Sequence, residues 1–283
     1  MKAVTEMDVQ FGGSMTDQKI DKVLNGVVGM LKDMGYEVVY VALYGSNNYL
    51  LDTPLSDLDF KAVVVPTLDD IVFGRRLVST THEFDIDGVQ GLVDIKDIRA
   101  MCSSWRKQNV NFIELLFTKY YYVNPIYTEE IKALRNNAEY IAHLDEAKAL
   151  SCCIGMAREK YAALFKPYPS QKEVVEEYGY AAKQLHHIHR LNILMRNYVN
   201  GAAYVDCLVP TEEERASLIE MKLYKPILDV ERVKADAEFI IHLMEKMRED
   251  YVAAEVDEEA GLILDKVQRN IIRKALIFEL KGR

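Results

Sequence analysis

The feature that most constrains the fold of this chain is a pair of aspartates, Asp57 and Asp59, in a strand-like run over residues 57–65. A run of β-branched and apolar residues precedes it, over 38–43, and a Gly-Ser dipeptide at 45–46 interrupts the chain between the two runs. Both runs are typical of strands, the first of a buried one. Because alternate residues of a strand point to the same face, the two carboxylates are expected to project together.

Two neighbouring carboxylates repel each other and need a cation or a proton to coexist. Mg²⁺ commonly binds through one or two carboxylates together with substrate phosphates. A Gly-Ser turn can present backbone N–H groups to phosphate oxygens. We therefore interpret the stretch as a site for a metal–nucleotide complex. The alternative is an acidic strand end that faces water after an ordinary turn, and the order strand, Gly-Ser, Ser-Asp-x-Asp, strand favours the first interpretation.

This stretch resembles the signature of the DNA polymerase β-like nucleotidyltransferase superfamily. Within it, the pattern is similar to that of the RNA-repair-pathway DNA polymerase β family of predicted nucleotidyltransferases, which is Gly-Ser-x-x-Tyr-Gly-Leu followed by Ser-Asp-x-Asp. The residues that match are Gly45, Ser46, Tyr49, Leu51, Ser56, Asp57 and Asp59. Leu50 stands where that family usually has glycine.

The resemblance implies an α+β fold, in which a polymerase β-like palm, a mixed sheet flanked by helices, is followed by an all-helical C-terminal domain. It also implies an enzyme that moves a nucleoside monophosphate from an NTP to a hydroxyl acceptor and releases pyrophosphate. Two Mg²⁺ ions, or Mn²⁺ in their place, would assist. The candidate nucleotide-binding residues of this half are Gly45, Ser46, Tyr49, Ser56 and Lys61.

Holding two metal ions requires a third carboxylate, which such sites usually take from a neighbouring strand. The Asp87-Gly88 pair between two alternating runs predicts a hairpin. We select Asp94 in its second strand, where it alternates with apolar neighbours, so that Asp57, Asp59 and Asp94 form the predicted catalytic and metal-binding set. Asp85 in the first strand is the alternative. Either could instead be a solvent-facing strand acid.

Further elements are predicted on both sides of this hairpin. Periodicity predicts helices from Thr16 to about residue 34 and over 67–76, and Asp97 is placed to cap a helix over 98–107. Lys107, Asn109 and Glu114 resemble a Lys-x-Asn-x-x-x-x-Glu-x-Leu block of the same family. We favour structural roles here, Asn109 as a helix cap and Glu114 as a surface acid or a partner for Arg106. Residues 120–124 predict a strand that closes the sheet.

The pattern changes to long helical periodicity after residue 126. We therefore predict a catalytic domain over 1–126 and a helical bundle domain over 127–283. Its helices are expected near 127–136, 140–165, 171–199, 211–221, 230–252 and 257–281, with breaks near Gly201, Pro210 and Pro226.

One predicted helix carries a basic stripe of Lys183, His187 and Arg190, spaced i, i+4 and i+7 on one face. Such a stripe is electrostatically favourable if it faces an anion. The RNA-repair-pathway DNA polymerase β family, which this sequence resembles, carries a similar Lys-x-x-x-His-x-x-Arg-Leu helix. We expect these residues to bind the triphosphate, the lysine and the arginine neutralising the departing pyrophosphate. The alternative is a solvated face neutralised by acids one or two turns earlier.

Composition limits the partners. The net charge of −9 argues against broad nonspecific affinity for nucleic acid. The resemblance points to an RNA end, tRNA-like, as acceptor, whereas the acidic balance favours a small molecule or a protein side chain. A non-catalytic nucleotide-binding sensor is a third possibility.

The sequence contains no uninterrupted run of about 18 apolar residues, so we expect no membrane-spanning helix. An N-terminus without an apolar signal core and four cysteines without CxxC spacing lead us to expect a cytoplasmic protein with reduced thiols and a loose leader over 1–15.

Overall fold

The computed structural model describes residues 15–53, 56–75, 77–223 and 229–281. The expected leader, apart from Met15, and the expected break at Pro226 lie outside the described residues. At the centre is a mixed five-stranded sheet in the order β3-β4-β2-β1-β5, in which β2 and β4 run parallel and the other neighbours run antiparallel. The strands are β1 Val38–Tyr44, β2 Asp59–Val64, β3 Ser79–Ile86, β4 Val89–Asp97 and β5 Tyr121–Val123.

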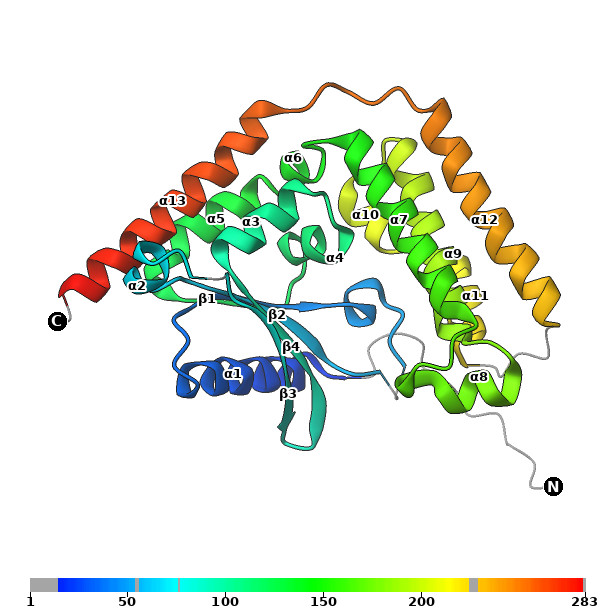
Figure 1. Ribbon diagram of the computed structural model, residues 1–283, viewed down its shortest axis with the longest axis horizontal. Helices are drawn as coiled ribbons and strands as arrows, with labels where there is room; N and C mark the ends of the chain where they lie inside the picture. Colours follow the sequence, from blue (N-terminus) through cyan, green and yellow to red (C-terminus); the bar gives the residue numbers. More distant parts are fainter. Residues whose placement is uncertain (1–14, 54–55, 76, 224–228, 282–283) are drawn as a thin grey trace.

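Helices cover both faces of this sheet, which is why β1 is apolar along almost its whole length (Figure 1). Helix α1, Asp17–Asp33, confirms the helix predicted from Thr16; it packs on one face of the sheet, and the side chain of Thr16 caps it. Helices α3, Ile98–Arg106, and α5, Thr128–Asn136, lie on the other side of the sheet. The predicted cap of α3 is confirmed, since the Asp97 side chain accepts a hydrogen bond from the Arg99 N–H.

The predicted hairpin between β3 and β4 is confirmed. Asp87 and Gly88 form its turn with φ angles of 53° and 73°. Two consecutive positive φ angles give the turn the twist of its strands, and glycine adopts such angles without steric cost. The closing strand predicted over 120–124 is β5 at the edge of the sheet, and the helix predicted over 67–76 is the short α2, Leu68–Val72.

The C-terminal part is helical, as predicted, with more breaks than the periodicity indicated. The remaining helices are α4 Val110–Ile113, α6 Ala138–Ala142, α7 Glu146–Leu164, α8 Lys172–Tyr178, α9 Ala182–Val199, α10 Tyr204–Leu208, α11 Glu212–Leu223, α12 Val230–Asp250 and α13 Glu258–Lys281, with 3-10 turns at Ser46–Tyr49, Glu114–Leu116, Pro125–Tyr127 and Pro169–Gln171. The single helix expected over 140–165 is interrupted after α6, and α7 starts after a cap at Asp145. The helix expected over 171–199 ends first at Gly179, whose φ of 79° stops α8.

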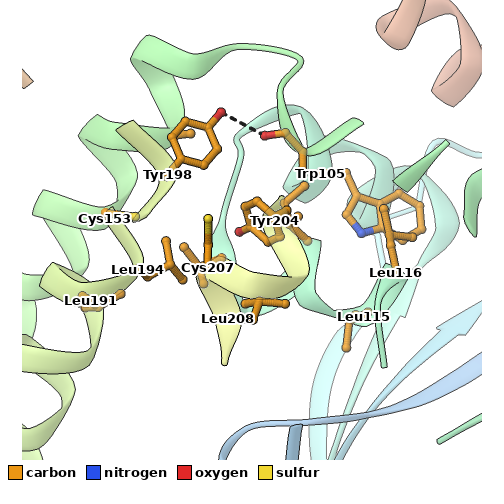
Figure 2. Packing of buried hydrophobic residues seen from close by; sticks show 14 of the residues in the cluster. Trp105, Leu115, Leu116, Cys153, Leu191, Leu194, Tyr198, Tyr204, Cys207 and Leu208 are labelled. Atoms are coloured by element: carbon orange, nitrogen blue, oxygen red, sulfur yellow. Dashed lines mark hydrogen bonds between the residues drawn. The ribbon is translucent and has the colours of Figure 1, made fainter. Parts of the chain in front are cut away.

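The hydrophobic core runs across residue 126 without a gap. One cluster joins β1 residues such as Tyr40 to residues of α5, α7, α9 and α13. Figure 2 shows part of it, where Trp105 and Leu116 lie near Tyr204 of α10, and the Tyr198 hydroxyl donates to the Ala142 carbonyl at 3.2 Å. Helix α13 returns to pack on α3 and α5 (Figure 1). The division at residue 126 stays a prediction.

These elements make an α+β protein with a mixed sheet and a helical C-terminal part, the class that the sequence predicted. None of the helices in the described part of the chain combines the length and the apolar character that a bilayer crossing requires.

Candidate functional site

A cleft of about 250 Å³ lies between the end of the sheet that carries the aspartate pair and the helices α7, α9 and α11. Its walls differ in charge. The wall from the first 126 residues carries carboxylates, and the wall from the three helices carries lysine, arginine and histidine. Charged and histidine side chains on the two walls are Asp57, Asp59, Glu114, Lys160, Lys183, His186, His187, Arg190 and Lys222.

Asp57 and Asp59 both line this cleft, as their spacing predicted. Strand β2 begins at Asp59 instead of at residue 57, yet the alternation holds, because Leu58 and Phe60 are buried toward α1. The backbone N–H of Leu92 donates to Asp59 Oδ1 at 3.0 Å and fixes the carboxylate. Partial burial raises the pKa of the Asp59 carboxyl, and the charge of Asp57 adds to that shift.

The Gly-Ser turn lies at the base of the cleft. Gly45 has a φ of 90°, which glycine adopts readily, and both Gly45 and Ser46 line the cleft. At Leu50, where the resembling family usually has glycine, φ is 58°. Leucine thus adopts here the left-handed conformation that glycine favours, so the backbone follows the path a glycine would allow and bears the steric cost of a Cβ atom.

A buried carboxylate supports this turn from below. Glu114 is 1% exposed, and its Oε2 accepts hydrogen bonds from the Tyr49 hydroxyl and from the Gly45 N–H at 3.3 Å. The expectation that Glu114 is a surface acid or a partner of Arg106 is wrong, because Arg106 binds Asp265 on α13 at 2.5 Å. Burial raises the pKa of the Glu114 carboxyl. The predicted cap is confirmed, since the side chain of Asn109 accepts from the Asn111 N–H at 3.0 Å.

The stripe on α9 faces the cleft, with Lys183, His187 and Arg190 all in its lining. Arg190 is only 6% exposed, and its guanidinium carbon lies 4.3 Å from the centroid of the Tyr49 ring. Its Nε and Nη1 atoms are buried without a hydrogen-bond partner among the described residues. Burial, reinforced by neighbouring cations, lowers the pKa of His187 well below its ordinary value, so that this histidine is neutral.

Two lysines complete the basic wall, and the sequence patterns did not single them out. Lys160 comes from α7 and Lys222 from α11. The Lys222 Nζ donates to Ser56 Oγ at 3.1 Å and to the Leu51 carbonyl at 3.3 Å, which ties α11 to the connection that precedes the aspartates. Burial lowers the pKa of Lys222, and the charge of Lys183 contributes to the shift.

Asp94 and Lys61 do not line the cleft; they bind each other. Lys61 Nζ lies 2.6 Å from Asp94 Oδ2, and the Thr81 hydroxyl donates to Asp94 Oδ1 at 2.6 Å. Burial acts to raise the pKa of the Asp94 carboxyl, but the hydrogen bond and charge of Lys61 outweigh it and hold this pKa below its usual range. Asp85 is exposed and its Oδ2 accepts from Gln90 Nε2 at 3.0 Å, so it too lies outside the cleft.

The donor set fits one hard cation. Two carboxylates open onto the cleft from neighbouring positions, and oxygen ligands of this type suit Mg²⁺ when substrate phosphates supply the others. Among the described residues, no group of three or more His, Cys, Asp or Glu side chains is placed to hold a metal ion.

Comparisons with known proteins add little to this geometry. The sequence matches no protein-family model and no curated protein. A search of solved structures matches a nucleotidyltransferase-like protein from Exiguobacterium sibiricum 255-15, at 12% identity over 90% of this chain and 80% of that one, with a TM-score of 0.33. A likeness at that TM-score carries no argument about the site.

Proposed function

We propose that this protein is a metal-dependent nucleotidyltransferase that binds an NTP in the cleft and transfers its nucleoside monophosphate to a hydroxyl group, releasing pyrophosphate. The observation that carries the proposal is the opposition of the two cleft walls. A metal–triphosphate complex has a cationic and an anionic part, and the cleft offers carboxylates to the first and fixed cations to the second.

The buried arginine supports an anionic ligand in particular. Arg190 is held 6% exposed with Nε and Nη1 unpartnered among the described residues. Leaving charged donors buried and unpaired is costly, and an anion that accepts from them removes the cost. A phosphate chain suits a guanidinium, which presents several N–H groups in one plane.

In this proposal Asp57 and Asp59 would hold a Mg²⁺ ion, whose chemistry would be to neutralise phosphate charge during the displacement. Lys160, Lys183 and Arg190 hold the phosphate chain against the Gly-Ser turn and neutralise the pyrophosphate as it leaves. Glu114 and Tyr49 act beneath the turn and keep its backbone in place.

The acceptor implied by the resemblance is an RNA end, and it is the one to test first. Small-molecule hydroxyls and protein side chains are the other acceptor classes. The competing function is a sensor that binds the nucleotide without transferring it. The presence of both Asp57 and Asp59 in the cleft favours an enzyme over a sensor, because proteins that keep such a fold without its catalytic activity commonly lose a metal ligand.

The test is transfer of label from each of the four α-labelled NTPs, with Mg²⁺, into a total RNA, protein and small-molecule extract. We expect label in one fraction with release of pyrophosphate, and a loss of about 10³-fold or more for Asp57→Asn and Asp59→Asn, since each removes several kcal/mol of transition-state stabilisation. Binding of an NTP by titration calorimetry without turnover in any fraction would identify the sensor. Asp85→Asn, an exposed acid outside the cleft, is the matched control.

A further inference from the structure

The face of the sheet that carries Asp59 determines how many metal ions the cleft can hold. On β2, Asp59 and Lys61 share that face, and on β4 it is shared by Leu92 and Asp94. The parallel register aligns Lys61 with Asp94. The residue of β4 beside Asp59 is therefore Leu92, whose backbone N–H reaches the Asp59 carboxylate.

The two strands approach closely at this point, which fixes the register. A Cβ atom on Gly91 would lie 1.8 Å from the Leu58 carbonyl oxygen, so only glycine fits there. With Gly91 against Leu58, Leu92 is held beside Asp59 and Asp94 beside Lys61. A carboxylate beside Asp59 would have to stand at the position of Leu92. Asp94 lies two residues further along β4, which is a distance of about 6.6 Å along the strand.

Both carboxylate oxygens of Asp94 already accept a hydrogen bond. Lys61 Nζ binds Oδ2 and the Thr81 hydroxyl binds Oδ1, each at 2.6 Å. The Lys61 side chain is 4% exposed and its Nζ lies 3.7 Å from the centroid of the Tyr44 ring, so it is packed in place. Turning Asp94 toward the cleft would leave a buried ammonium group without its carboxylate, which is strongly unfavourable.

We infer that the cleft holds one divalent cation per nucleotide and lacks the ligand for a second, because Leu92 occupies the position from which a third carboxylate could reach Asp57 and Asp59. This inference rests on the proposed function, and it departs from the two-ion set that the sequence predicted. In this chain Asp94 balances the charge of Lys61 and is not a metal ligand.

The test counts Mn²⁺ ions by electron paramagnetic resonance, with the protein in excess over an α,β-methylene analogue of each NTP, which cannot transfer its nucleoside monophosphate. We expect one Mn²⁺ per bound analogue in the wild type and in Asp94→Asn. Leu92→Asp supplies the missing carboxylate at a position that is 39% exposed, and we expect it to raise the number to two. Leu92→Asn is the matched control and should stay at one.

Two Mn²⁺ ions per analogue in the wild type would overturn the inference and leave the proposed function standing. If none of the four analogues binds, the proposed function fails and the inference falls with it. The wild-type count decides the matter even if Asp94→Asn does not fold.

Discussion

The guanidinium group of Arg190 lies over the ring of Tyr49, 4.3 Å from its centroid, and so joins the basic helix wall to the 3-10 turn Ser46–Tyr49. The Tyr49 hydroxyl in turn binds the buried Glu114, which accepts from the Gly45 N–H. These contacts link a helix of the C-terminal part to the Gly-Ser turn.

Replacing this arginine is expected to weaken nucleotide binding. Arg190→Met removes a buried guanidinium that would donate to the phosphates, and charge-assisted hydrogen bonds are worth about 1.5–3 kcal/mol, so the Kd for the NTP should rise about 10- to 100-fold. The Kd of Arg190→Lys should lie between those of the wild type and Arg190→Met, since a lysine keeps the charge without the planar set of donors. Titration calorimetry measures both.

The control for that experiment lies on the same helix. Arg196 binds Glu214 away from the cleft, so Arg196→Met should leave the Kd unchanged. An unchanged Kd for Arg190→Met in a protein with wild-type thermal stability would contradict a phosphate-binding role.

Tyr49→Phe is expected to destabilise the protein by about 1.5–3 kcal/mol in urea unfolding, because it takes a hydrogen bond from a buried carboxylate. Glu114 Oε1 already lacks a hydrogen-bond partner among the described residues, so this carboxylate has no spare hydrogen bond to offset the loss of the one from Tyr49. In a double-mutant cycle with Glu114→Gln, the coupling energy should be about 1–3 kcal/mol. As a control, Tyr168→Phe alters an exposed tyrosine and should change the free energy of unfolding little. Additive effects of Tyr49→Phe and Glu114→Gln in the cycle would refute the coupling.

His186 gives the protein a pH dependence of known sign. Its side chain is 2% exposed, its Nδ1 donates to the Leu218 carbonyl at 2.8 Å, and burial lowers its pKa to about 4. The folded state therefore disfavours protonation. The stabilising contribution is fully present above pH 6.5 and is lost as the pH falls through about 4, up to about 3 kcal/mol in total.

His186→Asn keeps a donor for Leu218 and cannot titrate. Urea unfolding between pH 7 and pH 4 should show the free energy of unfolding falling more steeply for the wild type than for the variant. His187 is present in both proteins, and burial is the larger cause of its lowered pKa, with the charge of His186 contributing less, so most of its effect cancels in the comparison. Parallel curves would show that His186 titrates normally.

Leu50→Gly is expected to stabilise the protein by about 0.5–1 kcal/mol. Leucine at a φ of 58° bears the cost of the left-handed conformation, and relief of that strain exceeds the added entropy of glycine in the unfolded chain. The side chain is 43% exposed, so little burial is lost. Leu50→Ala keeps the Cβ atom and should give no gain in thermal unfolding; equal effects of the two substitutions would argue against strain.

Local patterns allowed much of the cleft to be predicted. The alternation that places Asp57 and Asp59 on one face at the start of a strand, and the helical repeat that aligns Lys183, His187 and Arg190, are local patterns. All five residues line the cleft. The hairpin at Asp87-Gly88 and the cap at Asp97 are local in the same way.

The residues that sequence reasoning missed depend on tertiary packing. Lys160 and Lys222 belong to no pattern on their own helices, and they reach the cleft only because α7 and α11 pack on α9. Asp94 lies on the predicted face, but alternation does not determine the register of two parallel strands joined by a crossover. Glu114 stands between apolar residues on both sides, but glutamate is rarely fully buried unless it is paired, and its partners Tyr49 and Gly45 are brought to it only by the fold.

If the cleft binds a nucleotide as proposed, its division between early and late residues means that neither segment alone supplies the whole binding site. A fragment ending at residue 126 would retain Asp57, Asp59 and the Gly-Ser turn yet lose Lys160, Lys183, Arg190 and Lys222, which are all the lysines and arginines that line the cleft among the described residues. The remaining fragment would be expected to bind a divalent ion weakly, with similar affinity whether or not the ion carried a nucleotide.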